Sequence, residues 1–103
     1  MYEQAMNDWI ELVRPLFPAN VDFAKWDRSG VASDNLCRIE ASWKDANGKK
    51  SFVIQFEPAM AELYERTDVD WRAVGNSRVF AGVKKALDAG QWGVILDVDG
   101  KFT

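Results

Sequence analysis

The 103-residue chain contains no histidine and a single cysteine, Cys37. Without histidine, the protein lacks the usual general base near neutral pH and the commonest transition-metal ligand. A lone cysteine cannot form an internal disulfide, which fits a reducing compartment. Cys37 falls on the apolar face of a predicted strand, so we expect a small core residue rather than a nucleophile.

Long apolar runs and clustered positive charge are also missing. No run approaches the roughly 18 to 20 residues that span a bilayer, and the first residues, MYEQAMNDW, have no signal-peptide character. The formal net charge is −3, and the densest basic clusters are the pairs Lys49-Lys50 and Lys84-Lys85. Non-specific nucleic-acid binding needs clustered cations. We therefore expect a cytoplasmic protein that binds neither membranes nor nucleic acid.

What the chain does contain is typical of a globular protein. Hydrophobic residues make up 48% of it and charged residues 28%, which argues against disorder. Five tryptophans provide large side chains for a core. A chain of this length has room for one core only, so residues 1–103 are predicted to form a single compact domain.

The first half of the chain shows one helical pattern followed by strand patterns. Apolar residues spaced by three and four predict a helix over 2–13, which ends or kinks at Pro15. A short strand is predicted over 21–26. Alternating apolar residues then predict strands over 35–44 and 52–56, joined by a hairpin at Asn47-Gly48.

The second half predicts one or two helices and a last strand. Pro58 suits the first turn of a short helix over 58–66. A second helix is predicted to restart at Thr67 or Asp68, with an interruption possible at 75–77, and to end at Gly90. The apolar run 94–98 predicts a strand that is buried on both faces.

This order of elements predicts an α+β fold. It comprises an N-terminal helix, a three-stranded antiparallel meander, one or two helices, and a C-terminal strand that completes a four-stranded sheet. The helices are expected to cover one face of that sheet, and the last strand to be reached through a helical crossover.

The last residues, GVILDVDGKFT, contain the one motif that suggests catalysis. They resemble the first motif of the haloacid dehalogenase family, and the resemblance implies Asp97 as the nucleophile and Asp99 as the acid and base beside Mg²⁺. The family's other motifs have to follow this one, but only four residues follow Asp99 here. A strand that leaves the core through an Asp-Gly turn explains the same letters. A magnesium site built from Asp68, Asp70, Asp97 and Asp99 is a further alternative.

A wider resemblance concerns the segment FVIQFEPAMAELY after the Asn-Gly hairpin, in a tryptophan-rich, acidic, histidine-free chain. It is similar to small proteobacterial proteins known only as domains of unknown function. The resemblance implies a bacterial cytosolic protein and supplies no activity.

Two functions therefore stay open. The first is a non-catalytic protein-interaction module without catalytic residues or cofactor, whose partner is another protein or a second copy in a homodimer. Its surface could include Trp26, Trp43, Trp71 or Trp92, and Trp71, between two charged residues, is the one most readily placed at the surface. The second is a small Mg²⁺-dependent phosphoryl-transfer or hydrolase enzyme that uses Asp97 and Asp99.

Overall fold

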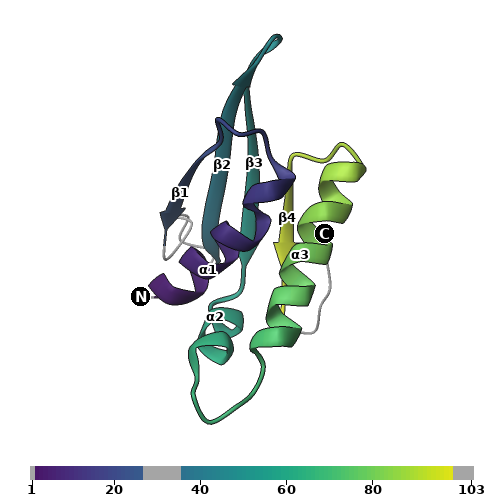
Figure 1. Ribbon diagram of the computed structural model, residues 1–103. Coiled ribbons are helices and arrows are strands. Elements are labelled where there is room, and N and C mark those ends of the chain that lie inside the picture. Colours follow the sequence, from purple (N-terminus) through teal and green to yellow (C-terminus); the bar gives the residue numbers. More distant parts are fainter. Residues whose placement is uncertain (1, 27–35, 99–103) are drawn as a thin grey trace.

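The computed structural model describes residues 2–26 and 36–98, which form a four-stranded sheet with its helices on one face (Figure 1). Helices α1 and α3 lie on that face, and α2 packs beside both at one end. The elements in chain order are α1 (Glu3–Val13), the short 3₁₀ turn η1 (Arg14–Leu16), β1 (Asp22–Trp26), β2 (Cys37–Asp45), β3 (Gly48–Phe56), α2 (Pro58–Glu65), α3 (Arg72–Asp88) and β4 (Gly93–Leu96).

The sheet is mixed. Its strand order is β1-β2-β3-β4, with β1 antiparallel to β2, β2 antiparallel to β3, and β4 parallel to β3. The predicted α+β class and the antiparallel meander are confirmed. The fourth strand runs parallel to the third because the chain returns to the same end of the sheet through α2 and α3 before β4 begins.

Helix α1 buries one stripe of its surface, as its apolar spacing predicts. The buried residues are Ala5, Met6, Trp9, Ile10 and Val13. Pro15 cannot donate a helical hydrogen bond, and the chain tightens into η1 from Arg14 onward. On the sheet side, alternate residues of β2 and β3 are buried in the same core, namely Cys37, Ile39, Ala41, Phe52, Ile54 and Phe56.

Helix α3 differs from the sequence prediction at its start and in its middle. It begins at Arg72, and Thr67 and Asp68 lie in the preceding loop. It then runs without a break through Gly75, where an interruption seemed possible. Glycine is needed there for packing, because a Cβ atom on Gly75 would lie 2.4 Å from Cζ3 of Trp71.

Strand β4 also differs from its prediction. It spans Gly93–Leu96 and lies at the edge of the sheet, paired with β3 alone. Val94 and Leu96 are buried under the helices, whereas Ile95 is 39% exposed on the opposite face. An apolar run therefore marks a strand at a sheet edge here, not one that is buried on both faces.

The Tyr64 side chain gives the fold a testable dependence on alkaline pH. It is 3% exposed, and its hydroxyl donates a hydrogen bond to Asp8 Oδ2 over 2.9 Å. Burial, and then the bond to and charge of Asp8, raise the pKa of Tyr64 above its ordinary value of 10.0. The unfolded chain therefore loses this proton at a lower pH than the folded protein does.

We expect this contribution to stability to be complete below about pH 10 and to be lost as the pH rises from there through the raised folded-state pKa. In Tyr64→Phe, the free energy of unfolding should fall less steeply with pH over that range. Urea unfolding of both proteins between about pH 8 and about pH 11 measures it. An equally steep alkaline loss in the variant would contradict the assignment to Tyr64.

Candidate functional site

The most distinctive surface feature is a two-stranded arm formed by residues 43–52 of β2 and β3 (Figure 1). Strand β1 pairs with β2 only as far as Ser42, and β4 pairs with β3 only from Val53 onward. Beyond those two points the hairpin has no neighbouring strand among the described residues, and it projects from the sheet. It turns at Ala46 and Asn47, and Gly48, which opens β3, has a φ of 111°, a conformation that glycine adopts without strain.

The arm carries an excess of positive charge. It contains Lys44, Lys49, Lys50 and Asp45, a net charge of +2 in a chain whose net charge is −3. Lys44 and Lys49 are directly opposite each other in the register, so their like charges share one face of the arm. Lys50 is opposite Trp43 and points to the other face.

None of these three lysines forms an ion pair with a carboxylate of the described residues. Five other cations there do so, namely Arg14, Lys25, Arg38, Arg66 and Lys84. The one carboxylate of the arm, Asp45, accepts a hydrogen bond from the backbone N–H of Asn47 in the turn. The arm therefore presents cations whose charge the described part of the chain leaves uncompensated.

The base of the arm is held in place on its helix-facing side by aromatic contacts. The Phe17 ring lies 5.5 Å from Trp43 and 5.8 Å from Phe52, centroid to centroid. It also makes an edge contact with Phe23 of β1 at 5.7 Å. These rings join both strands of the arm to the core and so fix the backbone at its base.

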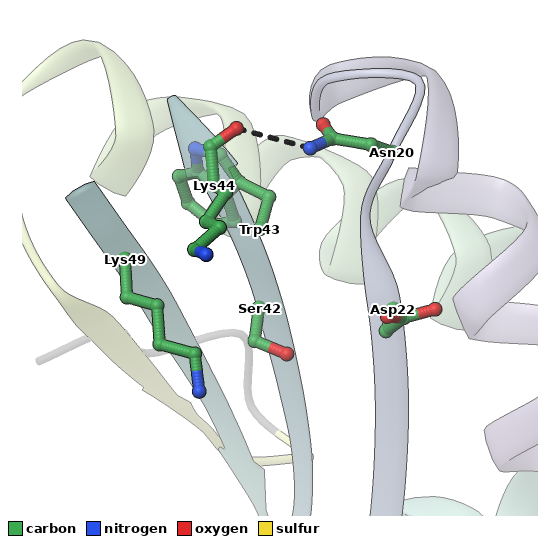
Figure 2. A pocket seen from close by; sticks show the side chains of 6 residues that line it. All are labelled: Asn20, Asp22, Ser42, Trp43, Lys44 and Lys49. Carbon is green, nitrogen blue, oxygen red and sulfur yellow. Dashed lines mark hydrogen bonds between the residues drawn. The ribbon is translucent and has the colours of Figure 1, made fainter. Parts of the chain in front are cut away.

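A hollow of about 320 Å³ opens at the base of the arm, lined by Asn20, Asp22, Ser42, Trp43, Lys44 and Lys49 (Figure 2). The Asn20 amide donates a hydrogen bond to the Lys44 carbonyl over 3.0 Å. The Asp22 side chain points away from the two lysines. Its charge acts on Arg14, whose pKa is raised mainly by the hydrogen bond to Glu11, with Asp22 as a lesser cause.

On its outer side, the β3 strand of the arm has unused backbone hydrogen-bonding groups. The Val53 N–H donates to the Trp92 carbonyl over 3.0 Å, and the Glu57 N–H donates to the Leu96 carbonyl over 3.2 Å. Backbone groups alternate along a strand, so the N–H and C=O of Lys49 and Ser51 point to the same side as those of Val53. Strand β4 begins only opposite Val53, and these groups have no partner in the described chain.

Trp92 lies where β4 begins, beside this free edge, and its side chain is 84% exposed. The segment 90–96 contains no charged residue. Trp92 and the free edge are therefore neighbours at the base of the arm, because the Trp92 carbonyl is bonded to the Val53 N–H.

The other tryptophans named by the sequence are less exposed where they are described. Trp71 is half-buried, packed on Gly75, with the Arg78 guanidinium 5.8 Å above its ring. Trp43 is also half-buried, at the base of the arm. The side chain of Trp26 lies outside the described part of the structure. The residues next to Trp92 in the sequence did not predict its exposure, because that exposure depends on where β4 joins the sheet.

The acidic residues considered for metal binding are not brought together where they are described. Asp68 forms an ion pair with Arg66 at 2.6 Å, and Asp70 is exposed in the same loop. Asp97 is half-buried directly after β4, and Asp99 lies outside the described residues. Within residues 2–26 and 36–98, no group of three or more acidic or cysteine side chains is close enough to hold a metal ion.

No protein-family model, no curated protein and no solved structure matches this chain. Across the part of the chain that is described, no helix is both long and apolar enough to cross a membrane. The chemistry of the surface itself is therefore the basis for a functional proposal. Ammonium groups, free backbone donors and acceptors, and an exposed indole are binding groups.

Proposed function

We propose that this protein is a non-catalytic protein-interaction module that binds its partner at the base of the arm, around Trp92. The observation that carries the proposal is Trp92, a tryptophan that is 84% exposed next to a free sheet edge. Buried tryptophans are among the strongest contributors to protein–protein binding energy, and they act where neighbouring contacts exclude water. Trp92 is positioned to become such a residue when a partner covers it.

The surroundings of Trp92 support binding in preference to chemistry. Ile95 is exposed on the other face of the same strand, and Val53 is half-exposed beside it on that face. Together with Trp92 they extend an uncharged surface around the edge of the sheet. The outer edge of β4 has no partner strand among the described residues and residues 93–96 carry no charge, so this edge is open to pairing with another chain.

The proposal includes a cytoplasmic location in a bacterial cell and a partner that is another protein or a second copy. Cys37 is the chain's single cysteine and is fully buried, so the fold has no internal disulfide that would need an oxidising compartment. The phosphoryl-transfer alternative receives no supporting observation from the described residues, and we do not carry it forward as a second candidate.

Trp92→Ala is expected to weaken binding to the native partner by about 30-fold, the effect of a 2 kcal/mol hot spot, and to leave the fold intact. Partner capture from native lysate by the immobilised protein identifies the partner, and titration calorimetry with the purified partner measures the affinity. Light scattering of the protein alone tests whether the partner is a second copy.

The matched control is Val74→Ala, which removes another exposed apolar side chain, on α3. It should bind as the wild type does. The proposal is wrong if Trp92→Ala binds every captured partner with unchanged affinity, or if Val74→Ala weakens binding as much as Trp92→Ala does.

A further inference from the structure

We infer that the arm is a docking site for an extended acidic segment of a partner protein, which adds as a strand to the free edge of β3 at Lys49–Ser51. This inference rests on the proposed function and specifies the chemistry of the partner. The segment lies in line with β4, beyond Trp92, and its carboxylates contact the lysines of the arm.

The backbone of β3 indicates an extended peptide. The hydrogen bonds from Val53 to Trp92 and from Glu57 to Leu96 show which edge of β3 is used by β4. The same edge continues past the start of β4, where the N–H and C=O groups of Ser51 and Lys49 have no partner in the described chain. An added strand satisfies these groups with main-chain hydrogen bonds, a common mode of peptide recognition.

The charges indicate that the peptide is acidic. Side chains of a strand alternate between its two faces, and so do the arm's lysines: Lys49 and Lys44 on one face, Lys50 on the other. An added strand therefore meets an ammonium group on each face. Carboxylates at successive positions pair with these ions and relieve the repulsion between Lys44 and Lys49.

The hollow at the base of the arm extends from Lys49 across β2 to Asn20 and Asp22, on the side of the arm away from the free edge of β3. Lys44, Lys49 and Ser42 line it with donors, and the Asp22 carboxylate points away (Figure 2). The Asn20 amide is already bonded to the Lys44 carbonyl, so it closes the opposite edge of the arm instead of offering that edge for pairing. Strand addition is therefore directed to the β3 side.

A protein segment is favoured over a nucleic acid. With the arm's net charge of +2 removed from the total of −3, the rest of the chain is strongly acidic and repels a polyanion. Three lysines on a narrow hairpin give little counterion release compared with the six to ten phosphate contacts of a typical DNA-binding protein. A nucleic acid also leaves the backbone groups of Lys49 and Ser51 without partners.

The test uses the full chain and a blocked ten-residue peptide with four consecutive glutamates flanked by valines, so that carboxylates lie on both faces of the added strand. Binding is measured by calorimetry at low salt. The same peptide with proline in place of the two valines next to the glutamates keeps the charge but cannot donate strand hydrogen bonds at those positions, and it tests for strand addition. An oligonucleotide of equal charge tests for unspecific anion binding.

The protein variants are Lys49→Glu/Lys50→Glu and its matched control Lys84→Glu/Lys85→Glu, which makes the same charge change on the second lysine pair of the chain, on α3. We expect the arm variant and the proline peptide each to weaken binding by at least about tenfold, because the first reverses charges that face the carboxylates and the second removes main-chain hydrogen bonds to β3. The control variant should bind within about threefold of the wild type.

Three results would overturn the inference: equal binding of the peptide by the arm variant and the wild type, equal binding of the proline peptide, or tighter binding of the oligonucleotide. The proposed function has a separate test. A native partner that is lost with Trp92→Ala but kept by the arm variant would reject the acidic docking site and leave the interaction module standing.

Discussion

Trp9→Ala is expected to lower the free energy of unfolding by about 3 to 5 kcal/mol, the largest effect of any single change considered for this fold. Domains of about this size have a total stability of about 5 to 15 kcal/mol. The variant should therefore be largely unfolded at physiological temperature or melt far below the wild type.

The reason lies in the position of Trp9 between the helix layer and the sheet. Its side chain is 1% exposed, on the buried stripe of α1. The indole makes an edge contact with Phe56 of β3 at 4.9 Å and with Tyr64 of α2 at 5.1 Å. Truncation removes contacts to both layers at once and leaves a cavity that three elements have to fill.

Trp9→Phe is the matched control. It keeps a ring against Phe56 and Tyr64, and it removes an indole N–H that is buried without a hydrogen-bond partner among the described residues. Its loss of stability should be clearly smaller than that of Trp9→Ala. Urea unfolding followed by far-ultraviolet circular dichroism gives both values. Equal losses, or a loss below about 1 kcal/mol for Trp9→Ala, would contradict the described core.

Gly93→Ala is expected to destabilise the protein by about 1 to 3 kcal/mol, although it adds only one methyl group. A Cβ atom at this position would lie 2.6 Å from the Val53 carbonyl oxygen and 3.5 Å from the Val53 Cβ atom. The clash is with backbone, so it can be relieved only if β4 moves away from β3.

Amide hydrogen exchange locates this effect. Among the described residues β4 pairs only with β3, so the Val53 N–H, which is bonded to Trp92, should lose protection from exchange in Gly93→Ala. The amides that bond β2 to β3 should lose no more protection than the change in global stability accounts for. Unchanged stability together with an unchanged Val53 amide would show that β4 tolerates the methyl group and that the described approach of the two strands is wrong.

Local patterns were sufficient to predict the first half of the fold. The spacing of Met6, Trp9 and Val13 specifies a helix with one buried face, and that helix is observed. Asn47-Gly48 predicts a tight hairpin between two alternating segments, and the hairpin is observed with its turn one residue earlier, at Ala46 and Asn47, so that Asp45 pairs with Gly48. In both segments the information lies within a few consecutive residues.

The second half depended on contacts between distant residues. The apolar run at Val94 predicts a strand, but only its pairing with β3 decides that it lies at an edge and leaves Ile95 exposed. The start of α3 was misplaced because acidic residues near Thr67 suit a helix start, whereas packing of Trp71 on Gly75 defines the first turn.

The candidate site could have been found only in part. Lys49-Lys50 appears in the sequence as one isolated basic pair, but the hairpin register adds Lys44 to it. That pairing could not be read from the Asn-Gly signal, because a two-residue loop at Asn47-Gly48 would place Lys44 opposite Ser51. The unpaired edge could not be predicted either, because it depends on how far β1 and β4 extend along their neighbours. The sequence shows that Trp92 lies between glycines near a turn, but it does not show that the side chain is exposed.

The central claim is that the arm and Trp92 form one binding surface. The most direct measurement is an amide spectrum of the ¹⁵N-labelled protein during titration with the acidic peptide. The account predicts that the amides of residues 49–53 and the Trp92 indole N–H shift and become protected from exchange, while the amides of α1 and α3 stay unchanged. Shifts confined to the helices, or no shifts at saturating peptide, would contradict it.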